Sequence, residues 1–194
     1  RAERRRDRRT GYPMITRTQE RELSARAREI LKKMAFPLAP SELDHIAVAD
    51  FGLSMPEREG AQILTLFATE RISAKLIVLL PGQILPEHWH PPVGADPGKE
   101  EILRGYWGKV MYFDEGAANL DQGEFPSDKA DCYTCRSRRD LSPGDQVIIP
   151  PGRKHWMKGG PEGGCVISFS TCVRDILDQF TDRDIVRTTK IVED

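Results

Sequence analysis

The spacing of apolar residues changes from a helical period to a strand period near residue 61. Before that point, apolar side chains recur every three or four residues, as on one face of an amphipathic helix. These positions are Leu23, Ala27, Ile30, Leu31 and Met34. Thr16 and Gln19 are spaced for a capping box that begins this helix, and Phe36-Pro37 can end it. The residues after Pro40 predict a short second helix with Ser41 as its cap.

From residue 61 onward, short runs rich in β-branched and aromatic residues alternate with turns rich in Gly, Pro and Asp. This pattern is typical of an all-β sandwich or barrel. The runs predicted as strands are Gln62–Phe67, Ala74–Leu80, Glu101–Tyr106, Lys109–Phe113, Gln146–Ile149 and Gly164–Thr171. Residues 114–140 are polar and irregular, and they predict a long excursion rather than a second domain. We therefore expect one structural domain, with a basic arm and helical extension over residues 1–60 and a barrel with its C-terminal segment over 61–194.

The composition is that of an ordinary globular protein. The chain has 194 residues, of which 39% are hydrophobic and 30% are charged, and its formal net charge is −1. This balance creates no global field that would attract nucleic acid or an anionic membrane. The longest aliphatic run, residues 76–80, is too short to cross a bilayer. Residues 1–9 form an arginine-rich arm, but no aromatic residues interleave it as in a nucleic-acid-binding segment.

Four cysteines are present, and two of them form a single CxxC pair. Cys132 and Cys135 have no second CxxC at the spacing of a zinc ribbon, and no helical pattern follows them as in redox proteins. We therefore expect neither a structural zinc nor a redox pair, but the reduced thiols of a cytoplasmic protein.

Three of the four histidines lie in two spaced motifs. The positions of these motifs are Gly82, His88, His90, Glu101, Gly108, Gly144, Pro150, Gly152 and His155. In a strand, His88 and His90 would point to the same face, as two ligands of one ion require. Glu101 begins another predicted strand and can supply an oxygen ligand, in preference to Glu100, and a rigid Pro/Gly turn can present His155. Such ligands suit Mn, Fe, Co, Ni or Zn and leave about two open positions on an octahedral ion, as catalysis or substrate binding requires.

These nine positions match the two sequence motifs of the cupin superfamily, apart from a longer gap between His90 and Glu101. The resemblance implies a small antiparallel jelly-roll β-barrel that holds one divalent metal. Over about residues 40 to 187 the chain resembles the D-lyxose ketol-isomerase family of cupins, which also explains the longer gap. The segments that carry this similarity are Ile77–Gln83, Pro86–Val93, Gly98–Glu101, Gly108–Tyr112, Ile149–Trp156, Gly160–Gly163 and Phe180–Asp182.

The family resemblance implies an enzyme that interconverts an aldose and a ketose, such as D-lyxose and D-xylulose. It implies a divalent metal, usually manganese, that polarises the sugar carbonyl and stabilises an enediolate. The residues that match the family's metal ligands are His88, His90, Glu101 and His155. Lys99 matches a lysine two residues before the glutamate ligand, where its ammonium can contact sugar oxygens or shuttle a proton.

The chain departs from the family at one position that concerns catalysis. Family members have a glutamate thirteen residues after the last histidine ligand as the acid/base, and Ser168 occupies that position here. A serine cannot act as a base near pH 7. Glu87 is close in sequence, but a regular strand would turn it away from the neighbouring histidines. Asp182 and Arg187 are further candidates, because the C-terminal segment could close over the site.

Two other functions remain open at this stage. Ser168 motivates a sugar-binding cupin that has lost catalysis, and the histidine and carboxylate ligands would also permit an iron-dependent cupin dioxygenase. Lys99 fits a polyol better than the substrate of an oxygenase. By analogy with cupin barrels that pair through sheet edges, we expect a homodimer, with no membrane or nucleic-acid partner.

Overall fold

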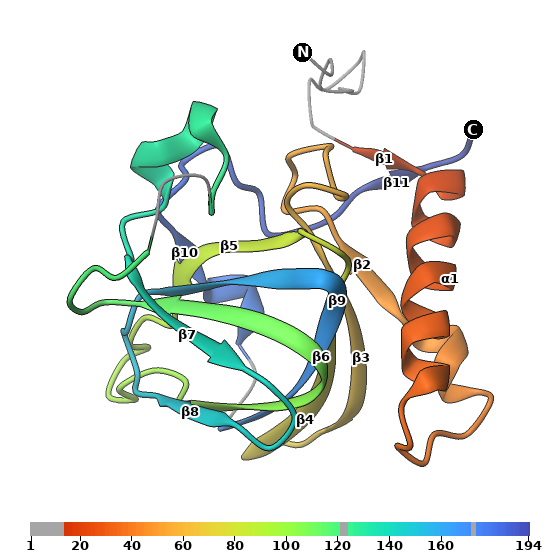
Figure 1. Ribbon diagram of the computed structural model, residues 1–194, viewed down its shortest axis with the longest axis horizontal. Helices are drawn as coiled ribbons and strands as arrows, with labels where there is room; N and C mark the ends of the chain where they lie inside the picture. Colours follow the sequence, from red (N-terminus) through yellow and green to blue (C-terminus); the bar gives the residue numbers. More distant parts are fainter. Residues whose placement is uncertain (1–13, 121–123, 172–173) are drawn as a thin grey trace.

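A curled antiparallel sheet forms the body of the protein, and one long helix packs against its outside (Figure 1). The computed structural model describes residues 14–120, 124–171 and 174–194. Its helical elements are α1 (Arg17–Lys33) and the 3-10 turns η1 (Glu42–His45), η2 (Ser127–Cys132) and η3 (Asp175–Leu177). Its strands are β1 (Ile15–Thr16), β2 (Ala47–Ala49), β3 (Ala61–Ala68), β4 (Ile72–Leu79), β5 (Ile84–Trp89), β6 (Glu101–Asp114), β7 (Ser137–Leu141), β8 (Gln146–Ile149), β9 (His155–Thr171), β10 (Gln179–Phe180) and β11 (Ile191–Val192). The predicted all-β barrel with an N-terminal helix is confirmed.

The two longest strands, β6 and β9, connect the parts of the sheet. The larger sheet has the order β10–β5–β9–β4–β3–β2, and β6 pairs with β7, β8 and β9. The first part of β9 pairs with β5, and its second part pairs with β4. Because β6 runs antiparallel along almost all of β9, the two strands bend together and curl the sheet into a jelly roll.

The two strands predicted over residues 101–106 and 109–113 are one continuous strand, β6. The register between β6 and β9 shifts between Gly105 and Trp107 and again between Gly108 and Val110, so the ladder bulges twice. Gly108 has φ 61°, and a Cβ atom at that position would lie 2.5 Å from the carbonyl oxygen of Gly163. A glycine is therefore needed where the strand bends, and the chain continues as a strand beyond it.

Helix α1 begins where the capping box predicts. The Thr16 hydroxyl accepts a hydrogen bond from the Gln19 amide, and the Gln19 side chain accepts one from the Thr16 amide. The apolar face of the helix packs on the outside of the sheet, in a cluster that includes Leu64, Leu76 and Val78. The predicted second helix is only the 3-10 turn η1. The Ser41 side chain forms no capping hydrogen bond there, so that part of the prediction is wrong.

The inside of the barrel forms a second apolar cluster, which includes Leu79, Leu103 and Val166. Residues 47–53 are part of the barrel, because β2 pairs with β3 and both Phe51 and Leu53 are buried in the inner cluster.

The long excursion contains η2 and β7, and β7 was not predicted. Cys132, Cys135 and Cys165 are free thiols, as predicted for the described cysteines. The basic arm lies outside the described residues.

The chain segments at residues 15 and 191 meet in a small parallel sheet. Ile15 pairs with Ile191, and Thr16 pairs with Val192 (Figure 1).

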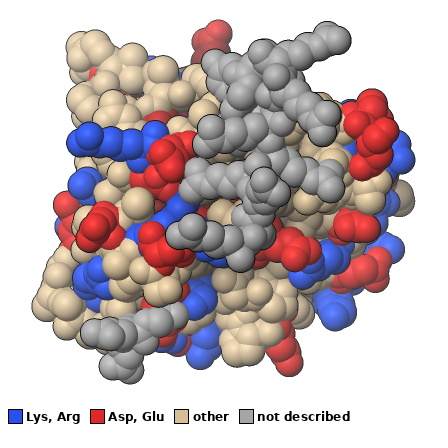
Figure 2. All heavy atoms as spheres, turned by 90° about the horizontal axis from the view of Figure 1, so that it is seen from above, with Lys and Arg blue, Asp and Glu red and all other residues tan. Residues whose placement is uncertain are grey.

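On the face drawn in Figure 2, the described Lys and Arg side chains are interspersed with Asp and Glu. Among the described helices, none is both long and apolar enough to span a membrane.

Candidate metal centre

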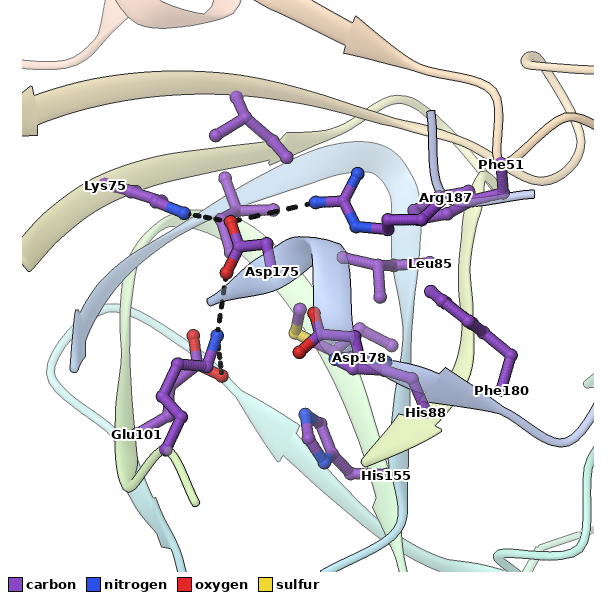
Figure 3. A pocket seen from close by; sticks show the side chains of 14 residues that line it. Phe51, Lys75, Leu85, His88, Glu101, His155, Asp175, Asp178, Phe180 and Arg187 are labelled. Atoms are coloured by element: carbon purple, nitrogen blue, oxygen red, sulfur yellow. Dashed lines mark hydrogen bonds and ion pairs between the residues drawn. The ribbon is translucent and has the colours of Figure 1, made fainter. Parts of the chain in front are cut away.

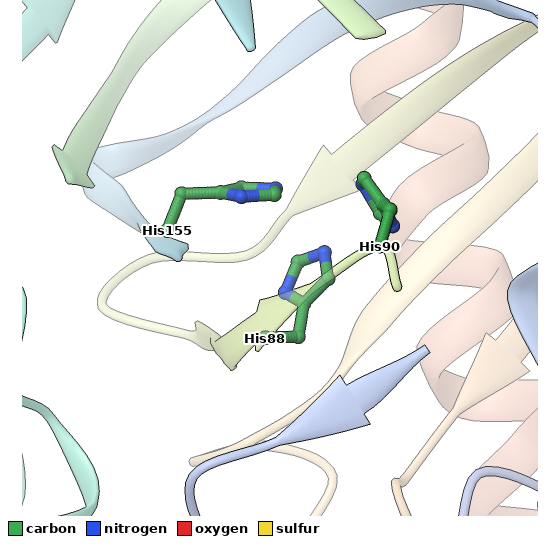
Figure 4. Close-up of side chains that lie close together, drawn as sticks. All are labelled: His88, His90 and His155. Atoms are coloured by element: carbon green, nitrogen blue, oxygen red, sulfur yellow. The ribbon is translucent and has the colours of Figure 1, made fainter. Parts of the chain in front are cut away.

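Three histidines meet inside one mouth of the barrel (Figure 4). His88 lies near the end of β5, His90 directly follows that strand, and His155 begins β9, where it is the register partner of His88. One ring nitrogen from each histidine lies within 4.8 Å of those of the other two. All three side chains are buried. The structure thus brings together the three histidines that the sequence motifs single out.

Each of these imidazoles has a hydrogen-bond acceptor at Nδ1. His88 donates to the carbonyl oxygen of Pro86 at 2.8 Å, and His155 donates to that of Arg153 at 2.9 Å. His90 Nδ1 lies 2.8 Å from Oδ1 of Asp178. Such outer contacts fix the ring orientation and the tautomer of a metal-binding histidine. They leave Nε2 of each ring as the nitrogen that can bind a cation.

Glu101 lies beside His90 at the start of β6, although its carboxylate is outside the group of donor atoms that lie within 4.8 Å of one another. Its Oε2 atom lies 3.0 Å from Nε2 of His90 and 3.5 Å from the ammonium of Lys99, and its Oε1 atom accepts a hydrogen bond from the Ser168 hydroxyl. Burial alone would raise the pKa of the Glu101 carboxyl, but Lys99 and His90 hold that pKa well below its usual value. The neighbouring Glu100 is exposed. Glu101 is therefore the glutamate that faces the histidines as a carboxylate.

Burial also sets the charge of the histidines. It lowers the pKa of His88 well below its ordinary value and that of His155 to about 4, so both rings are neutral near pH 7. Burial opposes protonation of His90 as well, but the hydrogen bonds to Asp178 and Glu101 raise its pKa. Neutral imidazoles and a carboxylate are the forms that bind a metal ion.

The residues present fit a divalent metal ion. Two donor atoms that bind one ion at right angles, with bonds of about 2.1 Å, lie about 3.0 Å apart, and the separation of His90 Nε2 and Glu101 Oε2 is 3.0 Å. The donor set of imidazole nitrogens and one carboxylate suits first-row transition metals. The fixed Nδ1 contacts supply the outer support that such a site needs.

A pocket with one charged side and one apolar side opens next to this cluster (Figure 3). Asp175, from the turn η3, forms ion pairs with three cations. Its carboxylate contacts the ammonium of Lys75, lies 3.4 Å from that of Lys99 and lies 3.7 Å from the guanidinium of Arg187. The apolar side consists of Phe51, Ile63, Ile77, Leu85, Met157 and Phe180. Polar groups opposite an apolar surface are typical of a small-molecule site.

The other candidate residues from the sequence lie in different surroundings. Arg187 lines the pocket, and Ser168 is buried beside Glu101. The Glu87 carboxylate accepts hydrogen bonds from the Cys135 amide at 2.7 Å and from the hydroxyls of Thr134 and Thr181 at 2.8 and 2.5 Å. It thereby joins β5 to the excursion and to the C-terminal segment.

Asp182 belongs to a buried charged network. Its carboxylate lies 2.6 Å from the ammonium of Lys129, which also lies 3.0 Å from Glu59. The Tyr133 hydroxyl donates to Glu59 at 2.6 Å. Asp182 and Glu87 are not among the described residues that line the pocket.

Three further charged residues line the pocket but match no motif in the sequence: Lys75, Asp175 and Asp178. Lys75 lies within the apolar run of β4, so a lone cation in a buried strand was a signal that could have been used. No local pattern distinguishes Asp175 and Asp178, because their place depends on how the C-terminal segment crosses the barrel mouth.

Comparisons with known proteins agree with this picture. No protein-family model matches the chain. The chain is 46% identical over 172 residues to the D-lyxose ketol-isomerase of Cohnella laeviribosi, a match that covers 88% of this chain and 94% of that protein. It is 39% identical over 179 residues to the D-lyxose/D-mannose isomerase of Thermosediminibacter oceani, with coverage of 92% and 99%. Among solved structures, the L-ribose isomerase of Cellulomonas parahominis shares the fold with a TM-score of 0.74 at 16% identity, covering 92% of this chain and 99% of that one.

The jelly-roll barrel with a histidine cluster in its mouth defines this protein as a cupin. Its similarity to curated proteins over nearly the whole chain is specific enough to identify its family. The chain belongs to the D-lyxose ketol-isomerase family, whose members are sugar isomerases.

Proposed function

We propose that this protein is a metal-dependent isomerase that interconverts D-lyxose and D-xylulose. The observation that carries the proposal is the convergence of three buried imidazoles, each held through Nδ1, beside a pocket lined with charged residues. The names of the curated relatives supply the substrate class. Because one relative is named for D-mannose as well as D-lyxose, both aldoses are candidate substrates.

In this proposal, His88, His90, His155 and Glu101 hold one divalent ion. Manganese is our first choice from the family resemblance, with Zn, Fe, Co and Ni as alternatives. When bound, the ion supplies Lewis acidity that polarises the sugar carbonyl and makes the neighbouring carbon-bound proton more acidic.

The side chains around the ion bind and orient the opened sugar. Lys99 and Lys75 present ammonium groups that can donate hydrogen bonds to sugar hydroxyls, and Arg187 offers a planar donor from the C-terminal segment. The apolar side, with Phe51 and Phe180, can pack against the carbon skeleton and exclude water. Proton transfer between C1 and C2 then requires a base within the same pocket.

The test is to load the purified protein with manganese and to follow D-lyxose, D-mannose and their ketoses by chromatography or NMR. We expect conversion of at least one pair, and no conversion after removal of the metal by a chelator. His155→Ala is expected to lose bound metal and activity, whereas His45→Ala, which changes the exposed fourth histidine, should keep both. No conversion of either aldose by protein with a full complement of metal would refute the proposal.

A sugar-binding cupin without catalysis is the second candidate, and Ser168 is the observation that favours it. Its hydroxyl donates a hydrogen bond to Glu101, and the family resemblance implies a glutamate at this position instead of a serine. Stabilisation of the protein against heat by D-lyxose, without any ketose formed, would support this function.

We also propose a homodimer by analogy with other cupin barrels. Size-exclusion chromatography with light scattering would test this oligomeric state.

A further inference from the structure

Proton transfer in the proposed isomerisation needs a group in the pocket that is ionised at neutral pH and can accept a proton. The inference below rests on the proposed function and identifies this group. Among the described residues that line the pocket, the carboxylates are Glu101, Asp175 and Asp178. The serine at position 168 cannot fill the role, so these three are the candidate carboxylates.

Two of the three carboxylates are already engaged with the metal centre. Glu101 lies 3.0 Å from Nε2 of His90, as a proposed ligand, and it accepts the hydrogen bond from Ser168. Asp178 lies 2.8 Å from Nδ1 of His90 and holds that ring in place. If either accepted the substrate's proton, it would weaken the binding of the ion on which the reaction depends.

Asp175 is different because it contacts cations of the pocket rather than the ligand set. It reaches the pocket from η3, where it pairs with Lys75, Lys99 and Arg187 (Figure 3). Lys75 is the register partner of Ser168 on the neighbouring strand. The Asp175 side chain is 20% exposed to solvent, whereas the Glu101 side chain is 5% exposed.

Lys99 lies between the two carboxylates. Its ammonium is 3.4 Å from Asp175 and 3.5 Å from Glu101, so the carboxylate oxygens of Asp175 and Glu101 are at most about 7 Å apart. A sugar bound by its first two oxygens beside Glu101 would therefore place C1 and C2 within reach of the Asp175 carboxylate. This is the arrangement needed for removing a proton and returning it on one face of the substrate.

We propose that Asp175 is the base that moves the proton between C1 and C2. Starting from the aldose, the Asp175 carboxylate takes the proton of C2. The electron pair of the broken C2–H bond forms the C1=C2 bond, and the carbonyl π pair moves to O1. The resulting carboxylic acid, whose proton can exchange with solvent, then protonates C1, while the hydroxyl proton of O2 passes to O1 and the C2=O bond forms. The step consumes no other reactant, and Asp175 ends as it began.

The three cations around Asp175 fix its charge and its position. Burial raises the pKa of the Asp175 carboxyl, but Lys99 and Lys75 hold that pKa below its ordinary value, so the group is an ionised carboxylate at neutral pH and a weaker base than a free aspartate. The ammonium groups of Lys75 and Lys99 line the same pocket, so they can stabilise negative charge that develops on the oxygens of a bound sugar. Arg187 holds Asp175 from the C-terminal side and fixes the turn on which it sits.

The test compares Asp175→Asn with wild-type protein, both loaded with manganese, using D-lyxose in D2O. We expect kcat to fall by about 10²- to 10⁴-fold, the usual contribution of a general base, with KM changed by less than about threefold. Exchange of the C2 proton with solvent should be lost to the same extent, while the metal content stays that of wild type. Glu70→Gln, in an exposed turn, is the control that should retain wild-type kcat and exchange.

A second variant separates proton transfer from a structural role. Asp175→Glu keeps the charge and the ion pairs but moves the carboxylate by about one C–C bond, ~1.5 Å, and we expect a loss in kcat of about 10- to 100-fold with normal folding. Wild-type kcat in Asp175→Glu, or more than a tenth of wild-type kcat in Asp175→Asn, would overturn the assignment. Absence of conversion by wild-type protein would instead refute the proposed function, so the two failures are distinguishable.

Discussion

Gln62→Met is expected to stabilise this protein, although it removes a polar side chain. Gln62 lies on β3 between its register partners Val48 and Val78, which belong to the apolar cluster between the sheet and α1. Its side chain is 0% exposed, and neither its amide oxygen nor its amide nitrogen has a hydrogen-bond partner among the described residues. The protein therefore buries an amide without recovering the hydrogen bonds that the amide makes with water.

The magnitude follows from the cost of burying such a group. An unpaired buried polar group costs about 1–3 kcal/mol in protein mutational data. Methionine has nearly the length and volume of glutamine, so the packing around Val48 and Val78 can be kept. We expect the free energy of unfolding to rise by about 1–2 kcal/mol, and Tm by roughly 2–4 °C for each kcal/mol.

Gln83→Met is the matched control, because Gln83 is also 0% exposed but has both amide atoms bonded. Its oxygen accepts from the Leu80 amide at 2.9 Å, and its nitrogen donates to the Pro56 carbonyl at 2.6 Å. This substitution leaves two buried backbone groups unpaired and should lower stability by about 2–4 kcal/mol. Urea unfolding followed by circular dichroism measures both variants. If Gln62→Met were less stable than wild type by more than about 0.5 kcal/mol, the reasoning would be refuted.

Three other changes test the site and its supports. Glu87→Ala removes the acceptor that joins β5 to the excursion and the C-terminal segment, and it should cost about 2–4 kcal/mol and make both segments more sensitive to limited proteolysis. Lys129→Met leaves Glu59 and Asp182 buried without their cation and should cost about 3–5 kcal/mol in urea unfolding. For metal-free protein, stability should fall by about 3 kcal/mol as pH decreases from about 6.5 to about 4, because the pKa of His155 is about 4 in the folded protein.

The sign of the pH effect follows from proton binding. Between these pH values, the unfolded chain protonates His155 while the folded protein keeps it neutral, so the unfolded state binds more protons and is favoured on acidification. A flat profile of unfolding free energy against pH over this range would contradict the prediction.

For the buried network of Lys129, Glu59 and Asp182, Arg26→Ala is the control, because its partner Glu57 is exposed and the pair should contribute less than about 1 kcal/mol. A Lys129→Met variant as stable as Arg26→Ala would be evidence against a buried, coupled network.

The predictions from sequence succeeded where a short pattern determines the structure. The capping box at Thr16 and the apolar face of α1 are local, and the helix forms as expected. The spacing of His88 and His90 reflects strand periodicity, and the structure places both side chains beside His155. The motif spacing also singled out Glu101, which the structure places next to His90.

The parts that could not be predicted depend on contacts between distant segments. Residues 101–114 form one strand because Gly108 takes a positive φ and the ladder bulges, which sequence alone reads as a break. Asp175 and Lys75 are a hundred positions apart and meet only after the C-terminal segment has crossed the barrel mouth. Glu87 turns away from the histidines as strand alternation suggests, but its partners Thr134 and Thr181 come from segments that no periodicity could relate to it.

The pairing of β1 with β11 links the pocket to the helix on the outside of the sheet. β1 directly precedes α1, and β11 follows the C-terminal segment that carries Asp175 and Arg187. The same segment is also held by the pairing of β10 with β5 and by the ion pair of Asp182 with Lys129. Local opening at the start of α1 would therefore release one attachment of the segment that lines the pocket.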